Sequence, residues 1–268
     1  MARADRLREL LDRMHPSGLL YTTYEHRLIA ELNANQLPHH VAVLADGNRR
    51  WARANAPGQP LVAGYQAGAD KLKDFVEWCD EVKIKIVTLW VLSTENYLRE
   101  GAEIARLLEV ITTMVEELAS HDGRVVRCVG ALDLLPDHIQ QRLQAAQDKT
   151  ASADGMVINI AVSYGGRHEL RDAFRSLLAE EAEKGTSAAD LAQTLEIDNI
   201  ADHLYTAGQP DPDLIIRTSG EQRLSGFLLW QSAHSEFYFC EALWPDFRKV
   251  DFIRALRAYG QRERRFGT

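Results

Sequence analysis

Six short apolar segments recur along the chain, and most of them are separated by stretches with helical periodicity. The segments are Val41–Ala45, Ile86–Leu92, Val125–Val129, Met156–Val162, Leu214–Ile216 and Phe237–Cys240. Short apolar runs that alternate with helical stretches are typical of a parallel sheet covered by helices. We therefore predict an α/β fold in which a single domain holds a largely parallel central sheet of about six strands, flanked by helices.

Two of the stretches between these segments carry amphipathic stripes. The first stripe is Leu72, Phe75, Val76, Cys79 and Val82, and the second is Ile104, Leu107, Leu108, Ile111, Met114, Val115 and Leu118. Apolar residues three or four positions apart share one face of a helix, so both stretches are predicted to be helices. Such stripes pack on a sheet, but part of the second could line a hydrocarbon pocket, and the sequence does not separate the two.

The first 36 residues differ in character from the rest of the chain. They are polar and predict an N-terminal arm, residues 1–36, with short helices at Leu7–Met14 and Tyr21–Leu32. Residues 37–268 then form the main domain. Within it, Glu180–Asp190 is charged and then rich in small residues, which predicts a surface loop.

Composition excludes several classes of protein. The 268 residues include 31 Lys and Arg against 39 Asp and Glu, and the net charge of −8 argues against a nucleic-acid binder with a basic face. Three cysteines far apart in the sequence suggest neither a disulfide framework nor a Cys-x-x-Cys metal site, which predicts a reducing, cytoplasmic location. No apolar run approaches the roughly 18 residues of a membrane span, so no signal peptide or transmembrane helix is expected.

The first apolar segment runs directly into the turn Asp46-Gly47-Asn48, which Arg49 and Arg50 follow. A glycine turn at the start of a helix leaves backbone N–H groups directed outward, where they bind anions. The arginines add fixed positive charge, and the Asp46 carboxylate offers the oxygen ligand that a divalent metal accompanying phosphate requires. The segment predicts a phosphate site, although a plain strand-to-helix turn with a solvated arginine pair would show the same pattern.

Polar clusters follow four of the six predicted strands. Besides residues 46–50, they are residues 93–96 (STEN), 163–167 (SYGGR) and 217–223 (RTSGEQR). In an open parallel sheet, ligands bind outside the carboxyl ends of the strands. We therefore expect the four clusters to converge on one crevice.

The cluster after the fifth strand is a second candidate anion site. Arg217 and Arg223 offer planar, forked donors of the kind that bind diphosphate. The nearby hydroxyl groups belong to Thr218, Ser219 and Ser225. Two arginine-bearing turns at one sheet edge suggest two phosphate-bearing ligands, whereas each arginine alone could form a surface salt bridge.

Glu236 precedes the aromatic strand and is a candidate metal ligand. A carboxylate beside apolar residues is unusual unless it is paired or bound to a metal, and with Asp46 it could complete a Mg²⁺ site; exposure to solvent at a strand start is the alternative. The nine histidines form no zinc pattern, and the sequence has neither a P-loop nor a dinucleotide-binding fingerprint.

Several motifs of the chain resemble the cis-prenyltransferases, also called Z-isoprenyl or undecaprenyl diphosphate synthases. They are His40–Arg53 (HVAVLADGNRRWAR), Gly64–Gly68 (GYQAG), Leu92–Arg99 (LSTENYLR), Ile160–Arg167 (IAVSYGGR), Asp211–Phe247 and the tail Arg265-Phe266-Gly267. The Asp-Gly-Asn-Arg and Arg-Thr-Ser-Gly-Glu-x-Arg blocks, in this order, are highly specific. The likeness spans about residue 38 to the C-terminus and implies the cis-prenyltransferase fold, with a catalytic domain over residues 37–268.

The resemblance implies a transferase of isoprenoid biosynthesis. Isopentenyl diphosphate would condense with an allylic diphosphate, creating a Z double bond and releasing pyrophosphate, with Mg²⁺ as the cofactor. Asp46 would direct Mg²⁺ and assist departure of the diphosphate, and Glu236 would share the metal. Ser93 and Asn96 would lie near the proton-abstraction step as further catalytic residues.

The resemblance also implies which residues bind substrate. The allylic diphosphate would lie against Gly47, Asn48, Arg49 and Arg50, and the diphosphate of isopentenyl diphosphate would lie against Arg217, Arg223 and Ser225. Ser93 and Asn96 also belong to the predicted binding set. Its remaining members are Trp51, Tyr65, Thr94, Glu95 and, as a supporting cation, Arg99.

Two departures from the long-chain pattern bear on the product. Long-chain members carry Arg and His where this chain has Leu61 and Tyr65, so one phosphate contact is missing; Tyr97 also replaces the usual Trp. Long-chain members also tend to have a small residue at the position of Val91, which Leu92 follows in this chain. A branched side chain there would shorten the space for prenyl units. The chain looks most like actinobacterial short-chain members, so we predict (2Z,6E)-farnesyl diphosphate made from geranyl diphosphate.

Other interpretations remain open. The chain could be a decaprenyl or undecaprenyl diphosphate synthase, or an enzyme that couples two allylic diphosphates. It could be a non-catalytic partner subunit, although such proteins typically lose the Asp that is present here as Asp46. A generic nucleotide- or sugar-phosphate-binding domain would explain the turns but not the apolar stripe. The family forms dimers, so we expect a homodimer that binds no nucleic acid, and contact of the arm with a membrane is left open.

Overall fold

The structure is a computed structural model that describes residue 32, residues 36–98 and residues 100–262. It has two compact units: His39–Asp246, and Met1–Pro38 together with Phe247–Thr268. Most of the predicted arm and the tail motif at 265–267 lie outside the described residues. The predicted division at residue 36 stays a prediction, and the segment from Phe247 groups with the N-terminal residues.

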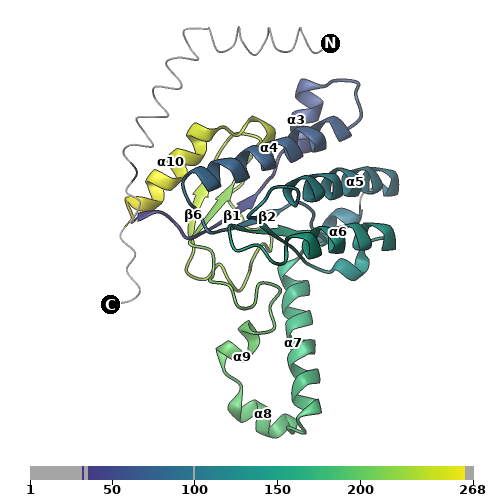
Figure 1. The fold of residues 1–268 in the computed structure, drawn as a ribbon, viewed down its shortest axis with the longest axis vertical. Helices are drawn as coiled ribbons and strands as arrows, with labels where there is room; N and C mark the ends of the chain where they lie inside the picture. The colour runs from purple at the N-terminus through teal and green to yellow at the C-terminus, as the bar shows by residue number, and fades with distance from the viewer. Residues whose placement is uncertain (1–31, 33–35, 99, 263–268) are drawn as a thin grey trace. The chain divides into compact units, whose positions relative to one another are not determined.

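The larger unit is built on a six-stranded parallel sheet, as the sequence predicts (Figure 1). Its strands are β1 (His40–Leu44), β2 (Ile86–Trp90), β3 (Val125–Val129), β4 (Val157–Ala161), β5 (Leu214–Arg217) and β6 (Glu236–Phe239). Across the sheet the order is β3-β4-β2-β1-β5-β6, and every neighbouring pair is parallel. β1 is central and fully buried, which explains the uninterrupted apolar run at 41–44.

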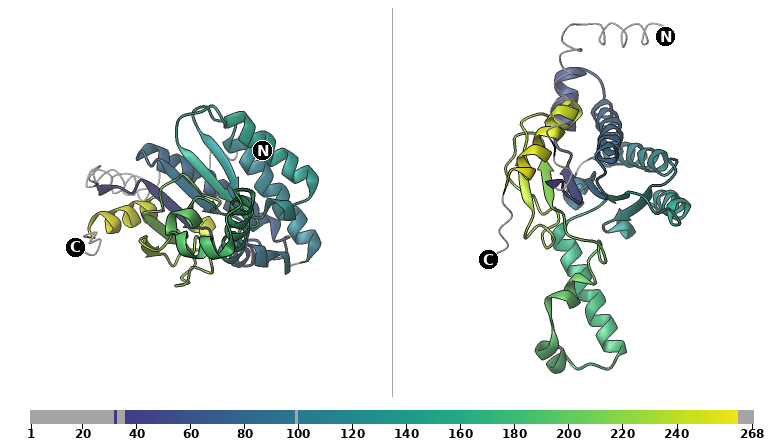
Figure 2. Two further views of the ribbon diagram at one scale, coloured as in Figure 1. Left: turned by 90° about the horizontal axis from the view of Figure 1, so that it is seen from below. Right: turned by 60° about the vertical axis from the view of Figure 1, so that its left-hand side comes forward.

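Helices follow most of the strands. In the larger unit they are α3 (Asn48–Asn55), α4 (Val62–Glu81), α5 (Gly101–Leu118), α6 (Asp137–Thr150), α7 (Gly166–Glu183), α8 (Ala188–Thr194), α9 (Ile197–Ala201) and the short 3₁₀ helices η2 (Thr94–Leu98), η3 (Leu132–Leu134) and η4 (Trp244–Asp246). The smaller unit contains α10 (Lys249–Gly260). α4, α5 and α6 pack side by side along the sheet (Figure 2). The two predicted stripes fall on α4 and α5 and are buried, apart from the partly buried Val82 just past α4.

Another buried cluster forms on the sheet face that carries Ala42 and Leu44. Phe227 and Leu228, from the segment after β5, pack there against Tyr164. The indole of Trp90 stacks on the Phe227 ring, with centroids 5.1 Å apart. The segment that covers this face is continuous with Arg223 and Ser225, so packing of the core also fixes part of the predicted anion site.

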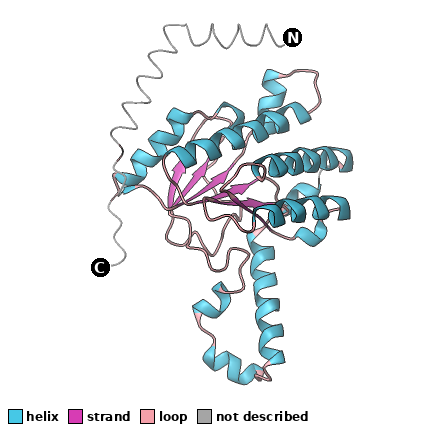
Figure 3. Ribbon diagram, viewed as in Figure 1, coloured by secondary structure: helices cyan, strands magenta, loops and turns pink. Residues whose placement is uncertain are grey.

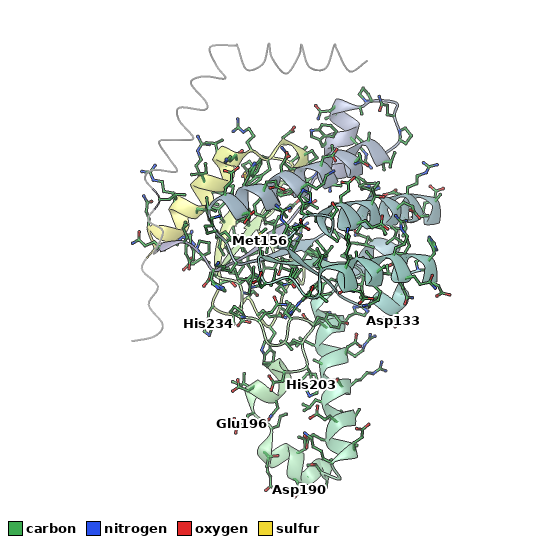
Figure 4. The ribbon with its side chains drawn as sticks, viewed as in Figure 1. Asp133, Met156, Asp190, Glu196, His203 and His234 are labelled. Atoms are coloured by element: carbon green, nitrogen blue, oxygen red, sulfur yellow. The ribbon has the colours of Figure 1, made fainter. Side chains whose placement is uncertain are left out.

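Helices α7, α8 and α9 extend from the sheet as a helical projection of the larger unit (Figure 3). The predicted loop at Glu180–Asp190 is shorter than expected, because α7 continues to Glu183 and α8 begins at Ala188. The ring Nδ1 of His203 lies 2.9 Å from the Ser176 hydroxyl and joins the turn after α9 to α7 (Figure 4). This helical projection exposes apolar surface at Phe174 and Leu178 on α7 and at Ile197 on α9.

A buried polar network crosses the larger unit from His40. The imidazole Nδ1 of His40 donates to the carbonyl oxygen of Pro210 (2.8 Å), so its Nε2 accepts from the hydroxyl of Thr88 (2.8 Å). Thr88 in turn accepts from the amide of Asn159 (3.0 Å), which pairs with the amide of Gln209. These bonds suit a neutral imidazole, because the Pro210 carbonyl and the Thr88 hydroxyl satisfy both ring nitrogens.

We expect the protein to lose stability as the pH falls from 7.5 to 5. Burial lowers the pKa of His40 from 6.5 to about 4, so the unfolded chain takes up a proton near pH 6.5 while the folded chain does not. The stability due to the neutral imidazole is complete above pH 6.5 and is lost as the pH falls toward 4, by about 2 kcal/mol at pH 5. Urea unfolding at both pH values measures this loss. Between pH 7.5 and pH 5, the free energy of unfolding of His40→Gln should fall by about 2 kcal/mol less than that of the wild type. An equal fall in both proteins would assign the effect to other groups.

Candidate active site

A cleft of about 420 Å³ opens at the carboxyl ends of β1, β2 and β5. Its volume lies within the roughly 300–1,000 Å³ typical of small-molecule sites. Its polar or charged lining residues are Asp46, Asn48, Arg49, Arg50, Arg53, Tyr65, Ser93, Asn96, Arg217, Arg223 and Ser225. The backbone of Gly47 also lines it. Its apolar lining residues are Leu44, Ala45, Trp90, Val91, Leu92 and Leu107. The cleft therefore combines a cationic part with an apolar part.

The start of α3 forms one side of the cleft. Gly47 precedes the helix with a φ of 111°, which other residues rarely adopt, and a Cβ there would lie 2.9 Å from the Leu243 side chain. No described side chain caps α3, and the first N–H groups of a helix have no partner within it. The N–H groups of Asn48 and Arg49, at the positive end of the helix dipole, therefore offer an anion site.

Two glycines of α4 allow α3 to pack closely against it. A Cβ at Gly64 would lie 2.2 Å from the backbone oxygen of Asn48, and one at Gly68 would lie 2.4 Å from its Oδ1. The buried Asn48 Oδ1 accepts no hydrogen bond within the described part of the chain. The Gly-Tyr-Gln-Ala-Gly motif thus positions the start of α3 beside the cleft.

Asp46 lies between the two arginine-bearing turns. Its carboxylate accepts a hydrogen bond from Arg217 Nη2 (3.2 Å) and lies 3.6 Å from Arg50 Nη2. The hydroxyl of Thr218 accepts from the backbone N–H of Asp46 (3.0 Å) and lies 2.9 Å from its carbonyl oxygen. The side chain of Asp46 is still 41% exposed, so a ligand or metal ion can reach its oxygens.

Arg217 ends β5 and organises the second turn. Its side chain is only 4% exposed, and its Nη1 donates to the carbonyl oxygen of Arg223 and to the hydroxyl of Ser225 (3.1 Å). Its Nε is buried without a hydrogen-bond partner among the described residues. Ser225 also has a positive φ of 51°, a strained conformation that surrounding contacts must hold. Arg217 therefore joins Asp46 to the segment that carries Arg223 and Ser225.

Ser93 and Asn96 reach the cleft from the turn after β2. The side-chain Oδ1 of Asn96 lies 3.5 Å from the Ser93 N–H, and the Asn96 N–H donates to the Ser93 carbonyl (3.1 Å). Ser93 also forms an isolated parallel bridge with Tyr164. Two small polar groups are thus held at the boundary between the cationic and apolar parts of the cleft.

The cluster after β4 does not line the cleft, which corrects the prediction that all four clusters converge there. Ser163 and Tyr164 are fully buried, and the hydroxyl of Tyr97 lies 2.6 Å from that of Ser163. β4 is separated from β1 by β2, whereas β2, β1 and β5 are neighbours. The cluster after β4 therefore supports the Ser93 turn from behind.

Val91 and Leu92 lie in the apolar part of the cleft, where the sequence places a wall against chain growth. Leu92 is buried and Val91 is partly buried. Leu107 from the α5 stripe faces the same space, so that stripe both packs and lines the pocket. The role of these residues in product length stays a prediction.

Tyr65 contacts a carboxylate that the sequence does not single out. Its hydroxyl donates to Glu103 Oε1, and the Nε of Arg49 lies 3.4 Å from the same oxygen. Glu103 stands in the first turn of α5. The three side chains link α3, α4 and α5 beside the cleft and orient the Arg49 guanidinium.

Three of the predicted substrate contacts do not line the cleft. The indole of Trp51 donates to Asp246 Oδ1 (2.8 Å), the hydroxyl of Thr94 lies 3.5 Å from His168 Nδ1, and Glu95 is exposed. Within one chain these side chains lie outside the cleft, and their role as substrate contacts stays a prediction. The predicted supporting cation, Arg99, lies outside the described residues.

Glu236 begins β6 and is remote from Asp46 within one chain, and its role as a metal ligand stays a prediction. The register pairs Glu236 with Leu214 and Leu214 with Val41, at the amino ends of the strands. Asp46 stands five residues after Val41, which corresponds to roughly 16 Å along the strand. Within the described residues, no cluster of three His, Cys, Asp or Glu side chains could hold a metal ion.

Two charged residues, one lining the cleft and one beside it, escape the sequence analysis. Arg53 lies one helical turn after Arg49 and Arg50, and this spacing on α3 could have indicated a third cation. Glu103 gives no comparable signal, because only the packing of α5 beside α3 and α4 brings it to Arg49.

The fold and cleft define an α/β protein whose parallel sheet carries, at its carboxyl edge, a site with a cationic part and an apolar part. Comparison with known families agrees: the chain belongs to the undecaprenyl diphosphate synthase family, whose family model matches residues 44–267. The prediction of a prenyltransferase with this fold is therefore confirmed.

Individual relatives cover most of the chain. It is 56% identical to a (2Z,6E)-farnesyl diphosphate synthase of Thermobifida fusca, over 92% of this chain and 97% of the relative. It is 53% identical to isoprenyl transferase 1 of Streptomyces avermitilis, over 93% and 96%. Among solved structures, lavandulyl diphosphate synthase from Lavandula x intermedia, in complex with dimethylallyl diphosphate, matches with a TM-score of 0.80 and 34% identity, over 87% of this chain and 100% of that one. Within the described part of the chain, we find no helix of the length and apolarity that a membrane span needs.

Proposed function

We propose that the chain condenses isopentenyl diphosphate with geranyl diphosphate to form (2Z,6E)-farnesyl diphosphate and pyrophosphate. The observation that carries this proposal is one cleft in which two arginine-bearing turns flank Asp46 and lead to an apolar end. The relative from Thermobifida fusca bears the name of this activity.

Each of the two arginine-bearing turns binds one of the two diphosphates. The allylic diphosphate lies at the start of α3, against the N–H groups of Asn48 and Arg49 and the Arg50 guanidinium, with its hydrocarbon chain toward Val91. The diphosphate of isopentenyl diphosphate lies against Arg217, Arg223 and Ser225. Both substrates then meet beside Asp46, held for in-line reaction.

The reaction needs stabilised negative charge and the loss of one proton. The bond between C1 and oxygen of the allylic substrate breaks, pyrophosphate leaves with the electron pair, and C4 of isopentenyl diphosphate bonds to that carbon. A proton then leaves C2 to form the new double bond. The cations of α3 stabilise the leaving group, and Ser93 and Asn96 are the small polar residues placed to accept or relay the proton.

Asp46 fits a Mg²⁺ ion that arrives with a diphosphate. Mg²⁺ usually keeps several waters and binds through one or two carboxylates plus substrate phosphates, so a single accessible carboxylate suffices on the protein side. When bound, Mg²⁺ would neutralise charge on the departing pyrophosphate. Asp46 is the residue that would hold it.

Replacing Val91 with alanine should lengthen the product. The smaller side chain removes part of the apolar wall of the cleft and opens room for a further prenyl unit. We expect part of the product to shift from 15 to 20 or more carbons, measured by chromatography after dephosphorylation. Val87→Ala, at a buried position of β2 outside the cleft, is the control. An unchanged product from Val91→Ala would show that this residue is not the wall.

The proposed reaction is tested by its substrate requirements. Pyrophosphate release by the purified protein with Mg²⁺ should require both isopentenyl diphosphate and an allylic diphosphate, and geranyl diphosphate should be used best among dimethylallyl, geranyl and farnesyl diphosphates. Absence of turnover with every pair would refute the proposal.

A second candidate is the coupling of two allylic diphosphates. The structural match to a lavandulyl diphosphate synthase that holds an allylic diphosphate favours it, as do Leu61 and Tyr65 at altered positions. Pyrophosphate release from dimethylallyl diphosphate alone, without isopentenyl diphosphate, would establish this activity instead.

We also propose that the protein is a cytoplasmic homodimer. Exposed apolar side chains support this: Phe174 and Leu178 lie on α7, and Phe239 lies separately on the edge strand β6. Exposed apolar patches mark interaction surfaces. The free thiols of the buried Cys79 and Cys128 suit a reducing compartment. Light scattering should give twice the mass of one chain, and Phe174→Glu with Leu178→Glu should give the mass of one.

A further inference from the structure

A buried carboxylate lies behind the cleft and takes no part in lining it. Glu169, in the first turn of α7, is 1% exposed. It accepts hydrogen bonds from the hydroxyl of Tyr164, from Gln231 Nε2 (2.9 Å) and from the backbone N–H of Tyr205 (3.0 Å). Burial raises the pKa of Glu169, and these bonds act in the opposite direction. A carboxylate is costly to bury, so its three donors imply a specific task.

Tyr164 connects Glu169 to both sides of the cleft. Its hydroxyl accepts a hydrogen bond from the backbone N–H of Leu228 (3.1 Å), three residues after Ser225. Its backbone N–H donates to the carbonyl of Leu92 (3.0 Å), and its own carbonyl accepts from the N–H of Thr94 (3.2 Å). One tyrosine therefore joins the segment that carries Ser225 to the segment that carries Ser93.

The start of α7 adds a direct backbone contact to the same segment. The N–H of Gly166 donates to the carbonyl of Gly226 (2.9 Å), and a Cβ at Gly166 would lie 2.4 Å from that oxygen. The contacts from Gly166 and Tyr164 thus hold residues 226–228 in place. Arg223 and Ser225 stand just before them, in a stretch whose backbone is strained at Ser225.

We infer that Glu169, acting through Tyr164, is a positioning residue for the second diphosphate subsite, the one formed by Arg223 and Ser225. This inference rests on the proposed function. The Tyr164 hydroxyl donates its proton to Glu169, so the hydroxyl oxygen is oriented to accept from the Leu228 N–H. This pair of bonds holds the segment that carries Ser225 at a set distance from the segment that carries Ser93. Among the residues that the structure describes, no hydrogen bond joins this pair to the allylic subsite at α3, so that subsite should be unaffected.

The test compares Michaelis constants in the variants Glu169→Gln and Tyr164→Phe. Glutamine can turn a donor toward the Tyr164 hydroxyl, whose proton then lacks its acceptor, and phenylalanine removes the hydroxyl. We expect KM for isopentenyl diphosphate to rise about tenfold in each variant, with KM for geranyl diphosphate changed less than twofold. Because the two residues act as one unit, the double variant should lose no more than either single variant.

A matched control separates positioning from loss of stability. Thr88→Val removes a hydroxyl from the His40 network, which is equally buried but makes no contact with the cleft. It should lower the thermal midpoint without changing either KM. If KM for both substrates rises together in Glu169→Gln, or if it follows the thermal midpoint across all variants, Glu169 is only structural and the inference fails.

Failure of the proposed function is distinguished by a binding measurement. If the wild type turns over no substrate pair, the proposed function fails, and calorimetry with inorganic pyrophosphate still tests the positioning role. The affinity for pyrophosphate should fall about tenfold at one of two sites in Glu169→Gln and stay unchanged in Thr88→Val. Equal pyrophosphate binding in both variants would overturn the inference.

Discussion

Replacing Asp46 with asparagine should lower kcat by about a thousandfold. The amide keeps the shape of the side chain and can still accept from Arg217, but it lacks the negative charge that would hold Mg²⁺ beside the departing diphosphate. Steady-state kinetics at saturating substrate and Mg²⁺ measure the loss.

The matched control for Asp46 is Glu100→Gln. This exposed carboxylate lies close along the sequence to the cleft residues Ser93 and Asn96 but does not line the cleft itself. It should retain kcat within about twofold. If Asp46→Asn kept a tenth or more of the wild-type kcat, Asp46 would not carry the role assigned to it.

Replacing Arg217 with lysine should raise KM for isopentenyl diphosphate by about a hundredfold. Lysine keeps the charge but has no planar fork, so it cannot contact Asp46, Ser225 and the Arg223 carbonyl at once. Losing the contacts of a buried charged group costs about 2–5 kcal/mol, and a hundredfold loss of affinity, about 2.7 kcal/mol, lies within this range. The initial rate as a function of isopentenyl diphosphate concentration gives the constant.

Arg142→Lys provides the comparison for Arg217. Arg142 also makes a two-pronged contact, with Glu116 at 2.7 Å through both Nε and Nη2, but it lies on α6 outside the cleft. Its replacement should leave both Michaelis constants unchanged. A similar rise of KM in both variants would mean that loss of an ion pair anywhere in the fold weakens binding.

Much of the fold can be predicted from local patterns in the sequence. The all-apolar run at 41–45, the turn with Gly47 and the stripes of α4 and α5 fix β1 and its flanking helices through periodicity and turn chemistry alone. The strand ends differ from prediction by one or two residues, as at β2, because they depend on the ladder with β1 and β4.

The site is predictable only where it follows from the rule that ligands bind at carboxyl ends of parallel strands. Arg217 and Ser93 obey that rule, because β5 and β2 flank β1. Tyr164 does not line the cleft because the order of strands, which the sequence does not reveal, places β4 beyond β2. Glu236 is the first residue of β6, so the same rule applied to it would have placed it at the other end of the sheet.

The most direct test of the account is the identity of the product that the purified protein makes from geranyl diphosphate and labelled isopentenyl diphosphate with Mg²⁺. Chromatography after dephosphorylation gives the chain length, and comparison with authentic isomers gives the geometry of the new double bond. The proposed reaction gives one product of 15 carbons, (2Z,6E)-farnesol. An E double bond, or products of 50 carbons or more, would contradict it.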